Sequence, residues 1–112
     1  MVSAKPYKHL TLEGTRTGLV VRFASANIFV ADEIQAIGRE LLRAADVAIS
    51  IDMTLFLSFQ GVDDMSSALL GKIVLLNKKI KSHGITMRLT DMSPTIKEVF
   101  RRTFGNDGSA FR

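Results

Sequence analysis

The chain contains no cysteine and no run of about 18 consecutive apolar residues. The absence of cysteine excludes disulfide bonds, thiolate metal sites and cysteine nucleophiles. The absence of a long apolar run predicts that no helix spans a membrane. Residues 1–9 also lack the apolar segment of a secretory signal. We therefore expect a cytoplasmic protein.

The 112 residues suffice for one domain and are too few for two ordinary ones. A chain of this size buries roughly 65% of its unfolded surface, so a single core can hold it together. The apolar fraction of 46% and the charged fraction of 23% are typical of globular proteins. We expect a single domain over residues 1–112, with poorly ordered ends at 1–7 and 105–112.

The formal net charge is +4. The positive residues gather where two helices are expected to end: Lys78, Lys79, Lys81, Arg101 and Arg102. Cations at helix C-termini complement the backbone dipole, which favours an ordinary exposed surface. The alternative is nucleic-acid binding through the three lysines and Arg88. Aromatic residues are not interleaved with these cations as base stacking would require, so we expect no nucleic-acid partner.

The first half of the chain predicts two strands and a helix. Residues 8–15 alternate loosely, and residues 19–23 are β-branched and aromatic, so the two segments predict an antiparallel hairpin around residues 13–18. Residues 31–45 carry apolar side chains at spacings of three and four, which predicts a helix. Residues 46–53 fit either a short strand or a loop.

The second half predicts strands alternating with helices. Residues 54–62 predict a strand that is apolar at Leu55, Phe56, Leu57 and Phe59, which indicates a strand covered on both faces. A helix follows from Ser66, a suitable N-cap, to about Ser82, with Gly84 placed to end it. Residues 85–89 predict a strand.

Ser93 and Pro94 predict the start of a last helix, which residues 105–108 would end. The order of elements is β-β-α-β-α-β-α. Strands that alternate with helices pair in parallel, and the opening hairpin adds an antiparallel edge. The fold class is therefore α/β, a single domain with a mixed β-sheet and packed helices.

Four stretches resemble a known family: Phe59-Gln-Gly-Val-Asp-Asp-Met-Ser-Ser-Ala-Leu-Leu-Gly71, Leu76-Asn-Lys-Lys79, Gly84-Ile-Thr-Met-Arg-Leu89, and Met92-Ser-Pro94 with Glu98-Val-Phe100. This combination resembles the STAS domain of bacterial anti-sigma factor antagonists. The resemblance is specific over residues 54–104. Over residues 8–45 it rests on the order of elements alone.

The resemblance implies a regulatory function. Small members of the family bind an anti-sigma factor that is a serine kinase, and this kinase phosphorylates a serine at the start of the helix after the third strand. The unmodified form binds the partner and frees the sigma factor, and a phosphatase resets the system. Alignment on Met65 and Gly71 places the phosphorylated residue at Ser67. Ser66 is the second candidate for phosphorylation, but we favour it as the helix cap. The alternative that Ser67 is an inert helix-start residue stays open.

The resemblance also implies a partner-binding surface around this helix start. It comprises Gly61, Val62, Asp63, Asp64, Met65, Ser66 and Ser67. The chain departs from the family at the end of the preceding strand, where an Asp-x-Ser pattern is usual and Ser58-Phe59-Gln60 stands instead. This departure leaves a phosphorylation-insensitive adaptor as an alternative.

A second alternative is a STAS-like domain that binds a small ligand or a lipid. It would be favoured by apolar side chains in excess of what the core needs, for which the candidates are Phe23, Phe29, Phe56 and Phe59. Related domains bind nucleotides or apolar ligands. The sequence leaves this alternative open, as it does the oligomeric state.

The sequence offers little for catalysis or metal binding. No set of nucleophile, base and orienting group stands out, so we expect no enzyme. Asp63 and Asp64 are adjacent carboxylates without further ligands, and we interpret them as helix-start charges. His9 and His83 are isolated, which favours surface histidines. We expect neither a cofactor nor a metal.

Overall fold

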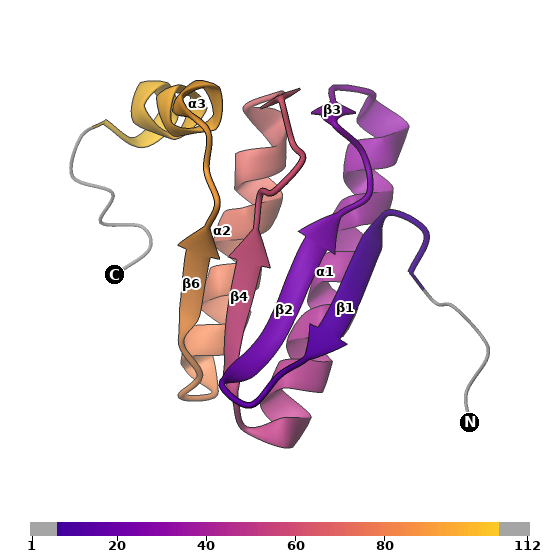
Figure 1. Ribbon diagram of the computed structural model, residues 1–112, viewed down its shortest axis with the longest axis vertical. Helices are drawn as coiled ribbons and strands as arrows, with labels where there is room; N and C mark the ends of the chain where they lie inside the picture. The colour runs from indigo at the N-terminus through magenta and orange to yellow at the C-terminus, as the bar shows by residue number, and fades with distance from the viewer. Residues whose placement is uncertain (1–6, 106–112) are drawn as a thin grey trace.

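The structure is a computed structural model in which residues 7–105 are described (Figure 1). Along this part of the chain the elements are β1 (Leu10–Gly14), β2 (Gly18–Phe23), β3 (Asn27–Ile28), α1 (Ala31–Ile51), β4 (Thr54–Ser58), β5 (Asp64–Met65), α2 (Ala68–Ser82), β6 (Met87–Thr90) and α3 (Pro94–Phe104). Apart from the two-residue strands β3 and β5, this is the predicted order. Residues 1–6 and 106–112, which make up most of the two ends expected to be poorly ordered, lie outside the described residues.

The main sheet has the strand order β1-β2-β4-β6. β1 and β2 form the predicted antiparallel hairpin, with Leu10 opposite Phe23 and Gly14 opposite Leu19. β2, β4 and β6 run parallel, because each is joined to the next by a segment that contains a helix. The predicted mixed sheet with an antiparallel edge is confirmed.

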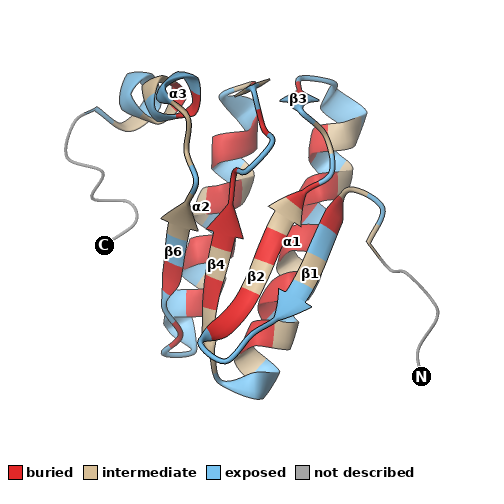
Figure 2. Ribbon diagram, viewed as in Figure 1, coloured by how far each residue is buried: buried red, intermediate tan, exposed pale blue. Residues whose placement is uncertain are grey.

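Helices α1 and α2 cover one face of the sheet, and within residues 7–105 no helix covers the other face (Figure 1). Leu55 and Leu57 of β4 are fully buried under the helices, whereas Phe56 between them is half-buried on the open face (Figure 2). The expectation that residues 54–62 are covered on both faces is therefore wrong. Because Phe56 on the open face is also apolar, the sequence did not show the alternation of apolar and polar side chains that is typical of a strand with one exposed face. The strand also ends earlier than expected, at Ser58.

Helix α1 extends to Ile51, so the strand or loop expected over residues 46–53 is wrong. The buried stripe continues through alanines, with Ala44, Ala45 and Ala48 all fully buried. The helix ends at Asp52, whose φ of 55° is left-handed. The N–H groups of Asp52 and Met53 donate to carbonyls of the last turn, so the helix stops without a glycine.

The ends of α2 and α3 follow the sequence signals. Gly84 has a φ of 75°, and its N–H and that of Ile85 donate back to the last turn of α2. The Ser93 hydroxyl accepts a hydrogen bond from the N–H of Ile96 at 3.2 Å, with proline at the first turn of α3. Gly105, with a φ of 76°, ends α3. The other three residues expected to end it, 106–108, lie outside the described residues.

A row of aromatic rings fixes α3 to the end of the sheet. The Phe23 ring at the end of β2 lies 5.3 Å from the Phe59 ring, centroid to centroid. The Phe59 ring in turn meets Phe100 of α3 edge to face at 5.7 Å. Such pairs add about 0.5–1.5 kcal/mol each beyond the area they bury. The row therefore places α3 beside the connection between β4 and α2.

Candidate functional site

The predicted serines lie at the carboxyl end of the parallel strands. Helix α2 begins at this end, next to α3 and the short strands β3 and β5 (Figure 1). In open α/β sheets this is the end at which ligands and partners are usually bound. The fold therefore brings the sequence-predicted site to the position where function is expected.

Main-chain hydrogen bonds hold the segment that carries the serines. β5 pairs in parallel with β3, with Asn27 opposite Asp64 and Ile28 opposite Met65. Just beyond this pair, the N–H of Ser66 donates to the carbonyl of Ile28 at 2.8 Å. Two-residue strands have no periodicity, so this pairing could not be predicted from the sequence. It fixes the backbone up to the first of the two serines.

Ser66 caps α2. Its hydroxyl accepts a hydrogen bond from the N–H of Ala68 at 3.1 Å, and its carbonyl accepts one from the N–H of Leu69. The sequence favoured Ser66 for this role, and the structure places it there. The capping bond satisfies one of the N–H groups that a helix leaves free at its start.

Ser67 is exposed and has helical backbone angles, φ −62° and ψ −19°. Its side chain makes no capping bond, and its hydroxyl has no hydrogen-bond partner in the described part of the chain. The residue is thus fixed through its backbone while its hydroxyl faces solvent. A hydroxyl in this position is accessible to another protein and can be modified without breaking an internal bond.

The two serines open onto a cavity of about 380 Å³. It is lined by Phe29, Met65, Ser66, Ser67, Val99, Arg102 and Thr103. Phe29 follows β3 and is 52% exposed, and its neighbour Val30 is 64% exposed. The sequence named Phe29 only as a possible ligand-binding residue and did not connect α3 with the serines. Only the three-dimensional packing brings these segments together.

Arg102 adds a positive charge to this cavity. Its Nε lies 3.9 Å from a carboxylate oxygen of Glu98, a long ion pair. Arg101 binds the same carboxylate through Nε at 2.9 Å and through Nη2, and these bonds hold the pKa of the Glu98 carboxyl below its usual value. Glu98 is thus occupied mainly by Arg101, which leaves the Arg102 guanidinium able to bind an anion at the cavity.

The other residues predicted to bind a partner differ in accessibility. Gly61 and Asp63 are exposed, and Asp64 is half-buried with its carboxylate accepting the N–H of Met65 at 2.8 Å. Val62 and Met65 are only 3% and 2% exposed and pack in the core, although Met65 also lines the cavity. The side chains that this segment offers to a partner are therefore those of Asp63 and the serines.

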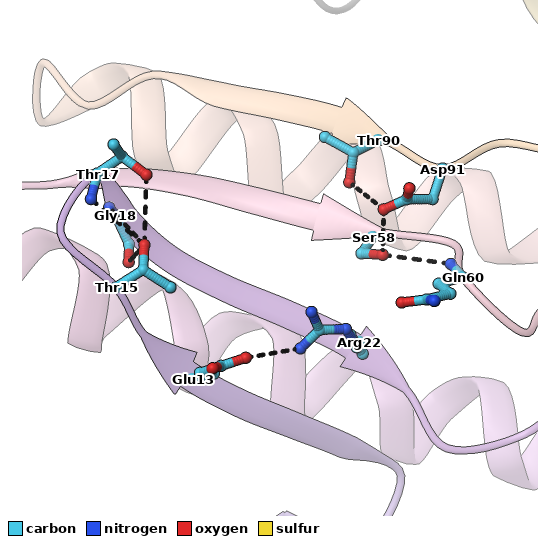
Figure 3. Close-up of polar contacts among 9 residues, drawn as sticks. All are labelled: Glu13, Thr15, Thr17, Gly18, Arg22, Ser58, Gln60, Thr90 and Asp91. Carbon is cyan, nitrogen blue, oxygen red and sulfur yellow. Dashed lines mark hydrogen bonds and ion pairs between the residues drawn. The ribbon is translucent and has the colours of Figure 1, made fainter.

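A second polar cluster lies at the end of β4 (Figure 3). The Ser58 hydroxyl donates to Asp91 Oδ2 at 2.8 Å, and Thr90 donates to the same oxygen at 3.0 Å. These bonds, with a smaller contribution from the charge of Arg22, hold the pKa of Asp91 below its usual value. The N–H of Gln60 donates to the Ser58 hydroxyl. A carboxylate thus stands beside Ser58, but it comes from the end of β6.

The aromatic residues proposed for a small-ligand site are divided. Phe23 and Phe59 are 7% and 1% exposed and belong to the core. Phe56 is half-buried on the open face of the sheet. Phe29 lines the cavity beside the serines. The structure therefore does not bring these four residues together in one apolar pocket.

The expectation that His9 is an isolated surface histidine is wrong. The ring Nδ1 of His9 donates to Glu40 Oε2 at 2.8 Å, and the main-chain N–H of His9 donates to Glu40 Oε1 at 2.9 Å. The two residues are far apart in sequence, so no local spacing revealed the pair. His83 is exposed and contacts only its own helix end within the described residues.

The cations considered for nucleic-acid binding lie on α2 and β6. Lys79 pairs with Asp46 at 2.8 Å, while Arg88 lies on β6. No group of three or more possible metal ligands occurs within residues 7–105. Across the same residues, no helix has the length and apolar character needed to cross a membrane.

Comparison with known proteins agrees with the fold. A family model described as the STAS domain matches residues 10–107. Among solved structures, the unphosphorylated form of the anti-sigma factor antagonist SpoIIAA is similar, with a TM-score of 0.68 and 20% identity over 86% of this chain and 81% of that chain. A Thermotoga maritima protein described as an anti-sigma factor antagonist gives a TM-score of 0.66 and 18% identity over 86% and 79%.

The Bacillus cell fate determinant SpoIIAA in its phosphorylated form is also similar, with a TM-score of 0.58 and 20% identity over 86% of this chain and 84% of that chain. No curated protein sequence matches the chain. At these identities the similarity to solved structures is a similarity of fold.

Proposed function

Because the chain belongs to the STAS domain family, we propose that it is an anti-sigma factor antagonist, a regulatory binding protein and not an enzyme. Its partner is an anti-sigma factor that is also a serine kinase, and binding of the unmodified chain frees the sigma factor. The observation that carries the proposal is the exposed Ser67 hydroxyl at the start of α2, which has no hydrogen-bond partner within the described residues.

Phosphorylation of Ser67 is the switch in this proposal. A phosphate adds about −1.5 to −2 charges at neutral pH. Within the chain the N-terminal end of α2 tolerates such a charge, because the free N–H groups and the helix dipole favour an anion there. In a packed interface the same charge must be desolvated or repelled, which abolishes binding. The domain itself need not refold.

The proposed partner surface is wider than the segment at residues 61–67. It includes the exposed side chain of Phe29, which lines the same cavity as the serines, and that of its neighbour Val30. These supply the apolar contact that stable interfaces need at their centre. Asp63 lies at its edge. A partner bound at Phe29 would cover Ser67, so partner binding and phosphorylation would involve the same surface.

The cycle requires a phosphatase to remove the phosphate and restore binding. Arg102, at the same cavity, is placed to form charge-assisted hydrogen bonds with a phosphate on Ser67. Both enzymes would reach the site from solvent. The cycle would take place in the cytoplasm, where the kinase finds ATP.

The test uses the partner kinase recovered with the full-length chain from its native cell. Incubation with ATP should label the wild type and fail to label Ser67→Ala. The Ser67→Asp variant should bind the kinase at least about 30-fold more weakly, since an unpaired charge in an interface costs about 2 kcal/mol or more. Ser82→Asp, with the same charge at the exposed far end of α2, should bind normally.

Two outcomes would overturn the proposal. Unchanged binding of Ser67→Asp would remove the switch. Labelling of a residue other than Ser67, with Ser67 unmodified, would remove the assigned site.

A further inference from the structure

The face of the main sheet that α1 and α2 leave open carries a row of side chains that crosses all four strands (Figure 1). Residues in register on neighbouring strands point to the same side of a sheet and lie next to each other. The row consists of Glu13, Val20, Phe56 and Arg88. It therefore runs from a negative charge on β1, through two apolar side chains, to a positive charge on β6.

The two apolar side chains form a flat centre of the open face. Val20 and Phe56 are only half-buried, and within residues 7–105 no helix covers them. A Cβ at Gly18 would lie 2.9 Å from Cε2 of Phe56, so the phenyl ring lies close over β2 at this glycine. An apolar centre with polar and charged side chains around it is the usual composition of a protein–protein interface.

The charges at the two ends of the row are able to bind a second molecule. Arg88 is exposed and makes no ion pair or hydrogen bond within the described residues. Glu13 binds Arg22 through Oε1 at 3.0 Å, while its Oε2 has no partner in the same part of the chain. A carboxylate accepts several hydrogen bonds, so the pair with Arg22 leaves room for a second guanidinium.

A second row lies next to the first, two residues further along β2. It consists of Thr11, Arg22, Ser58 and Thr90. The Asp91 carboxylate joins this row, because it accepts hydrogen bonds from the last two of these hydroxyls (Figure 3). The second row therefore has a positive charge on β2 and a negative charge beside β4 and β6.

We propose that the open face binds the open face of a second copy of this chain, related by a two-fold axis parallel to the strands. Such an axis reverses the order of the strands in the facing copy. Glu13 then lies opposite Arg88 of the second copy, and Arg22 lies opposite Asp91. Val20 lies opposite Phe56 at the centre. Two sheets pack face to face in this way with their strands aligned to within about 30°.

The order of charges selects this axis and this partner. A two-fold axis across the strands would instead place Glu13 opposite Glu13 and Arg88 opposite Arg88, where like charges repel. The two carboxylates and two guanidinium groups of the open face cancel in net charge, so a nucleic acid or an anionic membrane gains little from binding there. A second copy matches every charge with its opposite.

The size of the open face predicts a weak dimer. Strands about 4.8 Å apart and about five residues long make a face of roughly 15–20 Å on each side. This is smaller than the roughly 800 Å² that each partner buries in a standard interface. We therefore expect a dissociation constant between about 10 μM and 1 mM.

The dimer would leave the serine site accessible. The cavity at the serines is lined by none of the residues in the two rows. Because the two-fold axis runs parallel to the strands, the strands of both copies point in the same direction. Both copies therefore carry Ser67 at the same end of the dimer. This inference does not depend on the proposed function.

The test is sedimentation equilibrium of the full-length chain at concentrations from about 10 μM to 1 mM, the range expected for a small interface. Arg88→Glu and Glu13→Lys each place like charges opposite each other, so each variant should self-associate at least about tenfold more weakly. An equimolar mixture of the two variants restores opposite charges at both ends of the row and should associate like the wild type. Lys78→Glu, the same charge change on the exposed side of α2, should have no effect.

Three results would overturn the inference. The first is a wild type that stays monomeric over the whole range, whether or not the open face binds the kinase or a single-stranded oligonucleotide through Arg88. The second is a mixture of Arg88→Glu and Glu13→Lys that associates no better than either variant alone. The third is an equal loss for Lys78→Glu and Arg88→Glu, which would indicate a general charge effect.

Discussion

Ser66 and Ser67 are neighbours at the start of α2, yet only the Ser66 hydroxyl takes part in the fold. It accepts the N–H of Ala68 at 3.1 Å, whereas the Ser67 side chain makes no capping bond and is exposed. The Ser66 hydroxyl is therefore used in capping the helix, whereas the Ser67 hydroxyl stays accessible. This division explains how a modification could act on binding without acting on stability.

The two serines should separate in a stability measurement. Ser66→Ala removes the capping bond and should lower the free energy of unfolding by about 1 kcal/mol. Ser67→Ala removes no hydrogen bond and should stay within about 0.5 kcal/mol of the wild type. Urea denaturation of the three proteins measures both values. Equal losses for the two variants would show that the hydroxyls share the capping role.

Phe29 should contribute to partner binding and little to folding. Its side chain is 52% exposed beside Ser67, so Phe29→Ala should weaken binding to the kinase about tenfold, as expected when an aromatic anchor is removed. The matched control is Ile51→Ala, because Ile51 is 44% exposed at the far end of α1. Calorimetric titration measures both. A comparable loss in the control would place the interface elsewhere.

The sequence predicted those elements whose signals are local. The hairpin, the helix from Ser66, the glycine stop at Gly84 and the Ser93–Pro94 start each depend on residues within a few positions. The end of α1 was missed because alanines continue its buried stripe and Asp52 takes the left-handed position usually given to glycine. Val47, Ile49 and Ile51 alternate with small or polar residues, and this alternation made residues 46–53 resemble a short strand or a loop.

The candidate site was predicted only along one segment. The serines carried a helix-start signal, but Phe29 and Arg102 reach the same cavity from elements about 40 residues away on either side. Likewise, the carboxylate beside Ser58 belongs to Asp91, which directly follows β6, the strand beyond α2. Contacts of this kind are set by the packing of α3 and β6, and no spacing in the sequence reports them.

Gly18 and Gly71 should respond oppositely to alanine. A Cβ at Gly18 would lie 2.2 Å from the carbonyl oxygen of Thr54 on the paired strand, so Gly18→Ala should cost about 1–3 kcal/mol. A Cβ at Gly71 would meet nothing within 4 Å in the middle of a helical turn, so Gly71→Ala should stabilise by about 0.5–1 kcal/mol. Thermal melts of both variants suffice. A stabilised Gly18→Ala would mean that β2 and β4 are further apart than described.

The pair of His9 and Glu40 should make stability depend on pH. Burial raises the pKa of the Glu40 carboxyl, but the hydrogen bonds from the His9 side chain and backbone together lower it by more than burial raises it. The net pKa therefore lies below the usual 4.5. A carboxyl whose pKa is lowered by folding stabilises the fold above its unfolded pKa. That contribution is lost as the pH falls through the folded value.

The variant Glu40→Gln keeps the shape of the side chain and removes its charge. At about pH 7 it should lower the free energy of unfolding by about 1–3 kcal/mol, because hydrogen bonds to a charged group are lost. The difference from the wild type should shrink as the pH falls below 4.5, where the wild-type carboxyl also takes up a proton. Glu13→Gln, which breaks only an exposed ion pair with Arg22, should change stability little at any pH. Urea denaturation at a series of acidic pH values measures this difference. If the difference in free energy of unfolding between Glu40→Gln and the wild type stays constant as the pH falls, the charge of Glu40 does not hold the His9 segment to α1.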